Sequence, residues 1–389
     1  MKIQDLAESY FDQTVAFRRF LHKNPELDFQ EVQTSAFIRS QLEELGFSVH
    51  TGFATTGLVG SFETVKTEPR FLLRFDMDAL PVQEENEFEY RSLNPGKMHA
   101  CGHDGHMAIG LTVAWMIRQL QKELSGSFHL LFQPAEEIGQ GAETMIQDGV
   151  LDLIKPDYVL GAHLWNEKPL GWLGIVEGPL MAGASIVNIT IKGKGGHGGR
   201  PDATIDPIIT SAQLINQIQS IISRNLDPFE PAVISIGSIH GGSAFNIIPS
   251  TVEMTGTLRY FNIKTYNLIK NRLEAICKNL GEASGCHIDL SIEESTHATT
   301  NAALVRKAMK SASTHLVGPI QVDSSYKTMM SEDMSLFLEN VPGCFVLVGA
   351  GEIMEGKKYS HHHPKFDFNE HSLPIAAALL LQTCIELTS

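Results

Sequence analysis

Four short and mostly apolar runs constrain the fold of this chain more than any other feature. They are FLLRF (71–75), FHLLF (128–132), YVLGA (158–162) and CFVLV (344–348), each bounded by polar turns. Runs of this kind are typical of strands buried on both faces, as in parallel sheets. Segments of helical period lie between them, for example around 108–122. This alternation predicts an α/β fold with a mixed sheet flanked by helices.

Acids or histidines follow each of the four runs. These residues are Asp76 and Asp78, Glu136 and Glu137, His163, and the histidine triplet 361–363. Ligands of open α/β sheets bind beyond the carboxyl ends of the strands. The sequence therefore predicts a functional site at one edge of the sheet.

The segment HACGHDGH, between His99 and His106, concentrates three imidazoles, a thiol and a carboxylate. These groups bind first-row transition metals. Cys101 and His103 are two residues apart, so a short loop can direct both toward one ion. The other donors are scattered along the chain and include an acid pair, whereas structural zinc sites usually close with four ligands at local spacing. The pattern therefore favours a catalytic metal site.

The acid pair Glu136-Glu137 fits metal-assisted hydrolysis. Consecutive side chains on a strand end point in different directions. One carboxylate can then bind a metal while its neighbour takes the proton from an activated water. One histidine of the triplet 361–363 is expected to join the ligands. A thiol-dependent amidase with Cys101 as nucleophile is the alternative, but it leaves the acid pair without a role.

Length and composition set further limits. A chain of 389 residues suits two domains, and a formal net charge of −15 argues against nucleic acid or an anionic membrane as a partner. No apolar stretch is long enough to span a membrane. Five scattered cysteines and an opening segment without the apolar core of a secretory leader predict a cytoplasmic protein.

The sequence pattern changes between residues 183 and 297. Apolar and polar residues alternate in about four segments, and helical segments lie near 205–224 and 264–283. We therefore expect an α+β domain over 183–297, inserted into a domain made of 1–182 and 298–389. The glycine-rich turn around His197 lacks the ending of a phosphate-binding loop, which excludes nucleotide binding there.

The ordered motifs of the whole chain resemble the aminoacylase/carboxypeptidase family of dinuclear metallohydrolases. The most similar branch contains hippurate hydrolase, N-acyl-amino-acid amidohydrolase and indole-acetyl-amino-acid hydrolase. The resemblance rests on RRFLHKNPELDFQE (18–31), RFDMDALPVQE (74–84), MHACGHDGHMA (98–108), LLFQPAEEIGQGAETMIQDGVL (130–151), GAHLW (161–165), IKGKGGHGGRP (191–201), NIIPSTVEMTGTLR (246–259), SED (331–333) and HHPKFDFNEHSLP (362–374).

This resemblance implies a metal-dependent amidohydrolase and assigns its central residues. The implied metal ligands are Cys101, His103, Glu137, His163 and His362. They would hold two divalent ions, and zinc, manganese, cobalt and nickel all suit such a donor set. Glu136 would act as general base and acid, and Asp78 would orient a ligand.

The resemblance also implies a role for the inserted segment, as a ferredoxin-like lid and dimerisation domain. Its His197 would reach the active site of the partner subunit and stabilise the oxyanion, while Asn246 and Arg259 would bind the substrate. The implied substrate is an N-acyl amino acid or a short peptide, and the implied assembly is a homodimer or a higher homo-oligomer. A non-catalytic metal-binding protein of the same fold is the alternative, against which the acid pair argues.

Overall fold

The structure, a computed structural model, describes residues 2–351 and 359–388. The chain divides into two compact units. Unit 1 consists of Met1–Leu180, Thr299–Tyr326 and Asp333–Ser389, and unit 2 consists of Met181–Ala298 and Lys327–Glu332. Within the described ranges, no helix combines the length and apolar character needed to span a bilayer.

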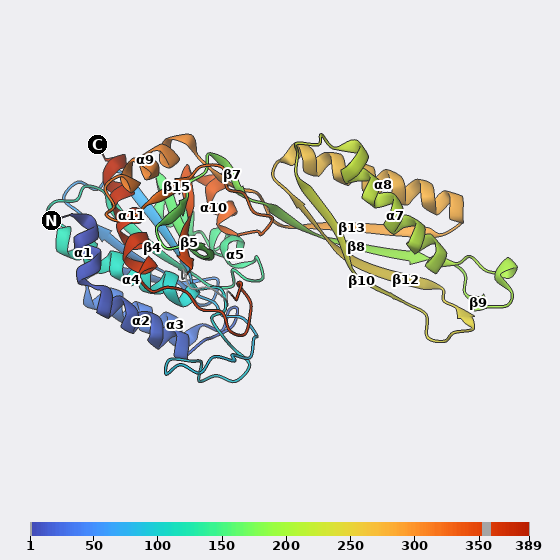
Figure 1. The fold of residues 1–389 in the computed structure, drawn as a ribbon, viewed down its shortest axis with the longest axis horizontal. Coiled ribbons are helices and arrows are strands. Elements are labelled where there is room, and N and C mark those ends of the chain that lie inside the picture. Colours follow the sequence, from blue (N-terminus) through green and yellow to red (C-terminus); the bar gives the residue numbers. More distant parts are fainter. Residues whose placement is uncertain (1, 352–358, 389) are drawn as a thin grey trace. The chain divides into compact units, whose positions relative to one another are not determined.

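An eight-stranded mixed sheet forms the centre of unit 1 (Figure 1). Its order is β1 (Ser48–Phe53), β2 (Gly57–Glu63), β4 (Ser127–Gln133), β3 (Arg70–Asp76), β5 (Tyr158–Pro169), β16 (Gly343–Gly351), β6 (Trp172–Gly174) and β15 (Gln321–Asp323). The adjacent strands β4, β3, β5 and β16 run parallel to one another. They contain the four apolar runs, and they are almost wholly buried because helices cover both faces.

Helices pack on both faces of this sheet, which confirms the predicted fold class. One face carries α3 (Val32–Glu44), α4 (His103–Leu120), α9 (Ala303–Ser313) and α11 (Ser372–Leu387), with α1 (Ile3–Ser9) and α2 (Phe11–Lys23) packed outside them. The other face carries α5 (Gly141–Gln147) and α10 (Met334–Asn340), with α6 (Val150–Ile154) beside α5. A short ribbon of β7 (Gly178–Met181) and β14 (Thr299–Asn301) completes the sheet structure of this unit.

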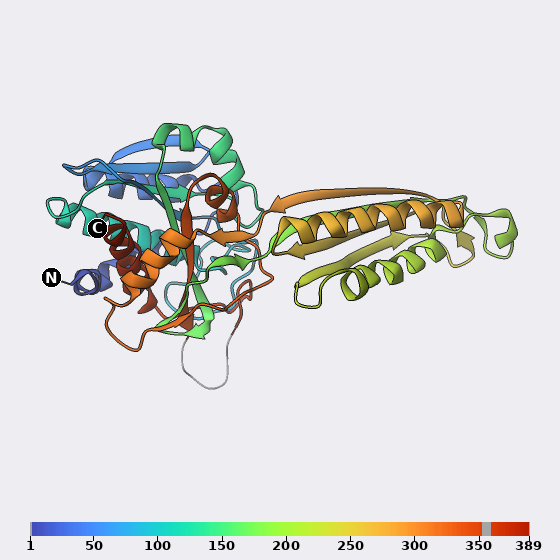
Figure 2. The same ribbon diagram turned by 90° about the horizontal axis from the view of Figure 1, so that it is seen from above.

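Unit 2 contains a four-stranded antiparallel sheet with two helices on one face (Figures 1 and 2). The sheet order is β10 (Ala232–Gly241), β12 (Thr251–Tyr260), β8 (Gly183–Lys192) and β13 (His287–Thr296). Helix α7 (Pro207–Asn225) follows β8, and α8 (Ile263–Ser284) follows β12. This βαββαβ order is the ferredoxin-like arrangement that the family resemblance implies.

Local sequence signals explain where the two helices of unit 2 begin. Asp206 accepts hydrogen bonds from the backbone N–H groups of Ile208 and Ile209, and Pro207 occupies the first helical position of α7. Asn262 caps α8 in the same way. A second ribbon, β9 (Gly196–His197) with β11 (Ile247–Ile248), and the 3-10 helix η1 (Pro201–Ala203) extend from the sheet.

Candidate metal centre

The candidate site of unit 1 lies at the carboxyl ends of the four parallel strands. Loops after β3 and β4 carry Asp78 and the acid pair, β5 carries His163, and the segment after β16 carries His362. Helix α4 begins at His103, directly after Gly102. Gly102 has φ +92°, a left-handed conformation that favours glycine, and this turn starts the helix at the site.

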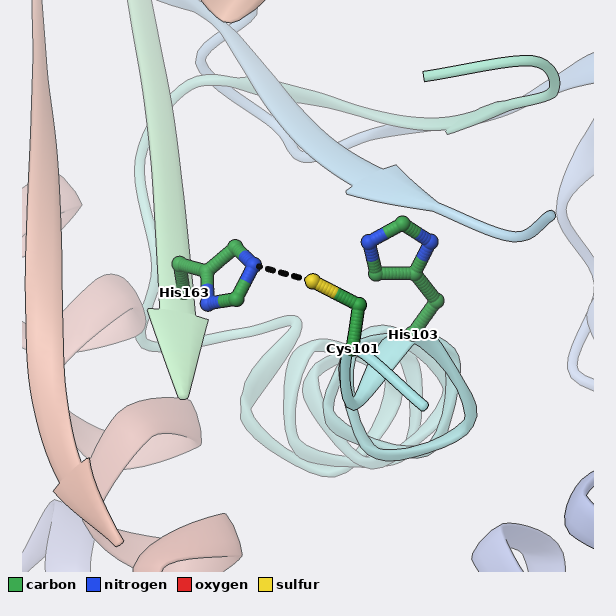
Figure 3. Close-up of side chains that lie close together, drawn as sticks. All are labelled: Cys101, His103 and His163. Atoms are coloured by element: carbon green, nitrogen blue, oxygen red, sulfur yellow. Dashed lines mark hydrogen bonds between the residues drawn. The ribbon is translucent and has the colours of Figure 1, made fainter. Parts of the chain in front are cut away.

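The structure brings all five predicted metal ligands together around Cys101. One group of donor atoms within 4.8 Å of one another contains Cys101, His103 and His163, and a second contains Cys101, Glu137 and His362. Figure 3 shows the Cys101 thiol between the imidazoles of His103 and His163. The Sγ of Cys101 lies 3.5 Å from Nε2 of His163. The two groups share Cys101, so they form one continuous centre.

Backbone oxygens orient two of these imidazoles. Nδ1 of His163 lies 2.8 Å from the carbonyl oxygen of Leu164, and Nδ1 of His103 lies 2.9 Å from that of Asp78. Each Nδ1–H therefore donates, which leaves Nε2 as the nitrogen that can bind a metal, the arrangement seen for metal-binding histidines. Nε2 of His103 has no hydrogen-bond partner among the described residues, which suits a metal ligand.

The charge environment of the centre also suits cations. Burial lowers the pKa of His163 well below its usual value, which keeps that ring neutral. Burial acts the same way on His103, but the carboxylates of Asp76 and Asp78 outweigh it and raise the pKa of His103 well above its usual value. The acids that attract a proton to His103 also attract a metal ion, and binding of the ion must displace that proton.

The acid pair follows Ala135, which has the left-handed φ of +54°. The backbone N–H of Glu137 donates to Asp78 at 2.9 Å, and Oε2 of Glu137 lies 3.2 Å from Nε2 of His362. Oε2 of Glu136 lies 3.9 Å from Nε2 of His103. Asp78 thus contacts both a candidate ligand ring and the backbone of another ligand, as a residue that orients ligands would.

The other histidines of HACGHDGH are used differently. Nδ1 of His106 lies 2.5 Å from Asp76, and its Nε2 accepts a hydrogen bond from the N–H of Leu164 at 2.9 Å. Both nitrogens are therefore occupied, and His106 links α4 to β3 and β5. His99 is buried outside the two donor groups, and burial lowers its pKa to about 4.

Only one member of the histidine triplet enters the donor groups. His361 is buried, and its Nε2 lies 3.1 Å from the carbonyl oxygen of Leu164. His363 accepts a hydrogen bond from the backbone N–H of Lys365 at 3.0 Å. His362 is the member that faces Glu137, and its backbone N–H donates to the carbonyl oxygen of Ala100 at 2.8 Å.

A buried ionic network lies beside the centre, and the sequence alone does not predict it. The guanidinium of Arg74 donates to Asp76 at 2.6 Å, to Gln133 at 2.8 Å and to Asp333 at 2.7 Å. This network connects β3, β4 and α10, and through Asp76 it holds His106. The motif RFDMD contains Arg74 and Asp76, but an arginine inside an apolar run gives no sign of an ionic network. Its partner Asp333 lies far away in the sequence.

The structure places His197 and Asn246 together in unit 2. His197 in β9 pairs with Ile247 in β11, and the N–H of Gly198 donates to the carbonyl oxygen of Asn246 at 2.7 Å. The His197 ring is exposed, and its Nδ1 accepts a hydrogen bond from the N–H of Gly199 at 2.9 Å. The proton of the neutral ring is therefore at Nε2, which is available as a donor.

Arg259 lies at the other end of the same sheet. It pairs with Ala184 at the start of β8, whereas Thr251 at the start of β12 pairs with Lys192 near the β9–β11 ribbon. At the usual rise of a strand, Thr251 and Arg259 are about 27 Å apart. Arg259 is half-buried, donates to the hydroxyl of Ser331 at 2.7 Å, and has no acidic partner in the described part of the chain. Burial lowers its pKa.

Comparisons with known proteins cover both units. The sequence model of peptidase family M20/M25/M40 matches residues 72–386. The IAA-amino acid hydrolase ILR1-like 4 of Arabidopsis thaliana is 38% identical, over 95% of this chain and 84% of its own. The N-acetyl-L-cysteine deacetylase of Bacillus subtilis (strain 168) is 36% identical, over 96% of this chain and 88% of its own. The crystal structure of the Bacillus subtilis YXEP protein, described as a dinuclear metal binding peptidase from the M20 family, has a TM-score of 0.85 at 30% identity and covers 98% of this chain and 99% of its own.

Proposed function

The chain belongs to peptidase family M20/M25/M40, and on that premise we propose that it hydrolyses N-acyl amino acids with Glu136 as the proton-transfer group. Its relatives include named hydrolases, deacetylases and a carboxypeptidase, and the protein is a metal-dependent amidohydrolase in this general sense. One observation carries the specific proposal. Both carboxylates of the acid pair lie in one donor group with His103, and Glu137 alone also lies in a donor group with Cys101 and His362.

In this proposal two divalent ions are held by Cys101, His103, Glu137, His163 and His362. Two donor groups that meet at Cys101 support this assignment. So do the buried Nε2 of His103 and Oε1 of Glu137, which lack hydrogen-bond partners among the described residues. Bound ions of this kind supply Lewis acidity, which lowers the pKa of water and polarises a carbonyl group.

Glu136 would take a proton from the attacking water and return it to the leaving amine. The donor groups support this division of labour, because Glu137 shares a group with Cys101 and His362, whereas no group among the described residues contains Glu136 with either of them. Asp78 would keep the ring of His103 and the Glu137 backbone in place. A general base positioned in this way typically contributes 10²–10⁴-fold in rate.

Residues of unit 2 would recognise the substrate. Arg259 is a half-buried cation without an acidic partner in the described residues, and the carboxylate of an amino acid would neutralise it. Nε2–H of His197 would donate to the oxyanion, and Asn246 lies beside it. The span of about 27 Å along β12 exceeds the length of an N-acyl amino acid. We therefore propose a homodimer in which Arg259 and His197 at each active site come from different subunits.

We also propose that the protein is cytoplasmic. All five cysteines are free and buried, which fits a reducing compartment. A separate contact bears on the thiol-dependent alternative. The Sγ of Cys101 lies 3.5 Å from Nε2 of His163, so the two groups could form a thiolate–imidazole pair.

A panel of N-acetyl, N-benzoyl and N-indole-acetyl amino acids, assayed with zinc, manganese, cobalt and nickel, tests the proposal. Glu136→Gln should abolish turnover while the bound metal is retained. Glu143→Gln, on the exposed side of α5, is the matched control and should retain activity. Activity that survives a chelator but not alkylation of Cys101 would replace this mechanism with the thiol-dependent one.

A further inference from the structure

Glu31 lies behind the loop that carries the acid pair. Its side chain is fully buried, and its two carboxylate oxygens contact two different segments. Oε2 accepts a hydrogen bond from the hydroxyl of Thr56 at 2.6 Å, and Oε1 accepts one from the backbone N–H of Ala135 at 3.2 Å. Ala135 directly precedes Glu136. None of the roles proposed above uses this buried carboxylate.

Both segments have backbone conformations that L-residues rarely adopt. Ala135 has φ +54°, and Ala54 and Thr55 have φ +45° and +68°. The N–H of Thr56 donates to the carbonyl oxygen of Ala54 at 2.8 Å, which closes a three-residue turn of the rare type with positive φ at its centre. Such conformations persist only where their surroundings hold them, and Glu31 provides a hydrogen bond to each segment.

The conformation at Ala135 sets the course of the acid pair. Its carbonyl oxygen accepts a hydrogen bond from the N–H of Gly141 at 3.0 Å, and the carbonyl oxygen of Glu136 accepts one from Gly139 at 2.7 Å. Both acids follow Ala135 directly along the chain. A rotation at Ala135 would therefore move Glu136 and Glu137 together, away from the other donors.

We propose that Glu31 is a positioning residue that holds the peptide at Ala135 in its left-handed conformation and so sets the direction of Glu136 and Glu137. This inference rests on the proposed function, which makes Glu136 the proton-transfer group. Burial raises the pKa of Glu31 to about 7, so its negative charge is weakly held near neutrality. The length of the Glu31 side chain, rather than its charge, should therefore control kcat.

Two substitutions separate reach from charge. Glu31→Gln keeps an oxygen within reach of Ala135 but removes the charge, whereas Glu31→Asp keeps the charge and shortens the side chain by one methylene. Glu26→Ala is the matched control, because Glu26 belongs to the same segment and accepts hydrogen bonds from the N–H groups of Gln33 and Thr34 at the start of α3. Loss of this cap should lower stability without moving the acid pair.

Steady-state kinetics and hydrogen–deuterium exchange of residues 133–141 measure the effect. Glu31→Asp should lower kcat by about tenfold or more with KM changed less than about threefold, because a small misplacement of a catalytic group is costly. It should also accelerate exchange of 133–141, with and without added metal. Glu31→Gln should keep kcat within about threefold of wild type and keep wild-type exchange, and Glu26→Ala should change neither.

Three outcomes would overturn the inference. The first is a wild-type kcat and wild-type exchange in Glu31→Asp. The second is an equal loss of kcat in Glu31→Gln and Glu31→Asp. The third is a loss of kcat in Glu26→Ala as large as that in Glu31→Asp. A wild-type protein that cleaves no N-acyl amino acid would instead refute the proposed function. The exchange measurement would then still test Glu31, because it needs no substrate.

Discussion

Two inactive variants should restore activity when mixed if each active site draws on two subunits. Glu136→Gln removes the proposed base of unit 1, and His197→Ala removes the proposed oxyanion donor of unit 2. Within unit 2, His197 lies in the β9–β11 ribbon near the Thr251 end of β12, and Arg259 lies about 27 Å from Thr251 along that strand, so one copy of this unit does not bring both to one small substrate. If both residues act on the same substrate, as we propose, a second copy supplies one of them.

The size of the recovery follows from subunit arithmetic. Random pairing of equal amounts gives about half heterodimers, and each heterodimer has one site with both an intact Glu136 and an intact His197. Recovery should therefore reach about a quarter of wild-type activity. His197→Ala alone should lose about 3 kcal/mol of transition-state stabilisation, roughly 10²-fold in kcat. The recovered signal should thus stand well above either variant alone.

Co-expression of the two variants with different affinity tags, followed by tandem purification, isolates the heterodimer, which should show about half of wild-type turnover because one of its two sites is intact. A mixture of Glu136→Gln with His163→Gln is the matched control. Both of these substitutions lie in unit 1, so no heterodimer contains an intact centre, and no recovery is expected. A purified heterodimer of Glu136→Gln and His197→Ala that stays inactive would refute the shared site and require each chain to act alone.

Three further predictions follow from buried groups of unit 1. Arg18→Met should lower the free energy of unfolding in urea by about 3–5 kcal/mol, because it leaves the buried Asp104 carboxylate without the guanidinium 2.8 Å away. Burial opposes protonation of His22, but Asp104 outweighs it and raises the pKa of His22. The stability that protonated His22 contributes is therefore complete below about pH 6.5 and is lost as the pH rises through the raised pKa. Urea unfolding from pH 6 to 9 should show this decline in the free energy of unfolding, and His22→Gln should make the decline smaller. By elemental analysis, His163→Gln should bind less metal than wild type, whereas His361→Gln should bind the same amount; equal metal in both would contradict the assigned ligands.

The four central strands could be predicted from the sequence because buried parallel strands require continuous apolar runs. The polar residues after those runs then had to meet at one edge of the sheet, which is why the sequence could place Glu137 and His163 together. Cys101 and His103 joined them through the metal-binding segment HACGHDGH and the family resemblance. The choice of His362 within its triplet depended on the family resemblance. The three histidines of this triplet differ only in the direction of their side chains, and a sequence of three identical residues does not indicate these directions.

The sequence by itself determined which chemistry this protein can perform, because donor types and their positions at strand ends are local properties of the chain. The tertiary structure decided which residues serve that chemistry and which support it. His103 and His106 are equivalent by composition, but the packing of α4 against β3 and β5 occupies both nitrogens of His106 and leaves Nε2 of His103 facing the centre. Arg74 and Glu31 likewise acquire their roles only through partners far away in the sequence, since hydrogen bonding of a buried charge depends on distances that no local pattern records.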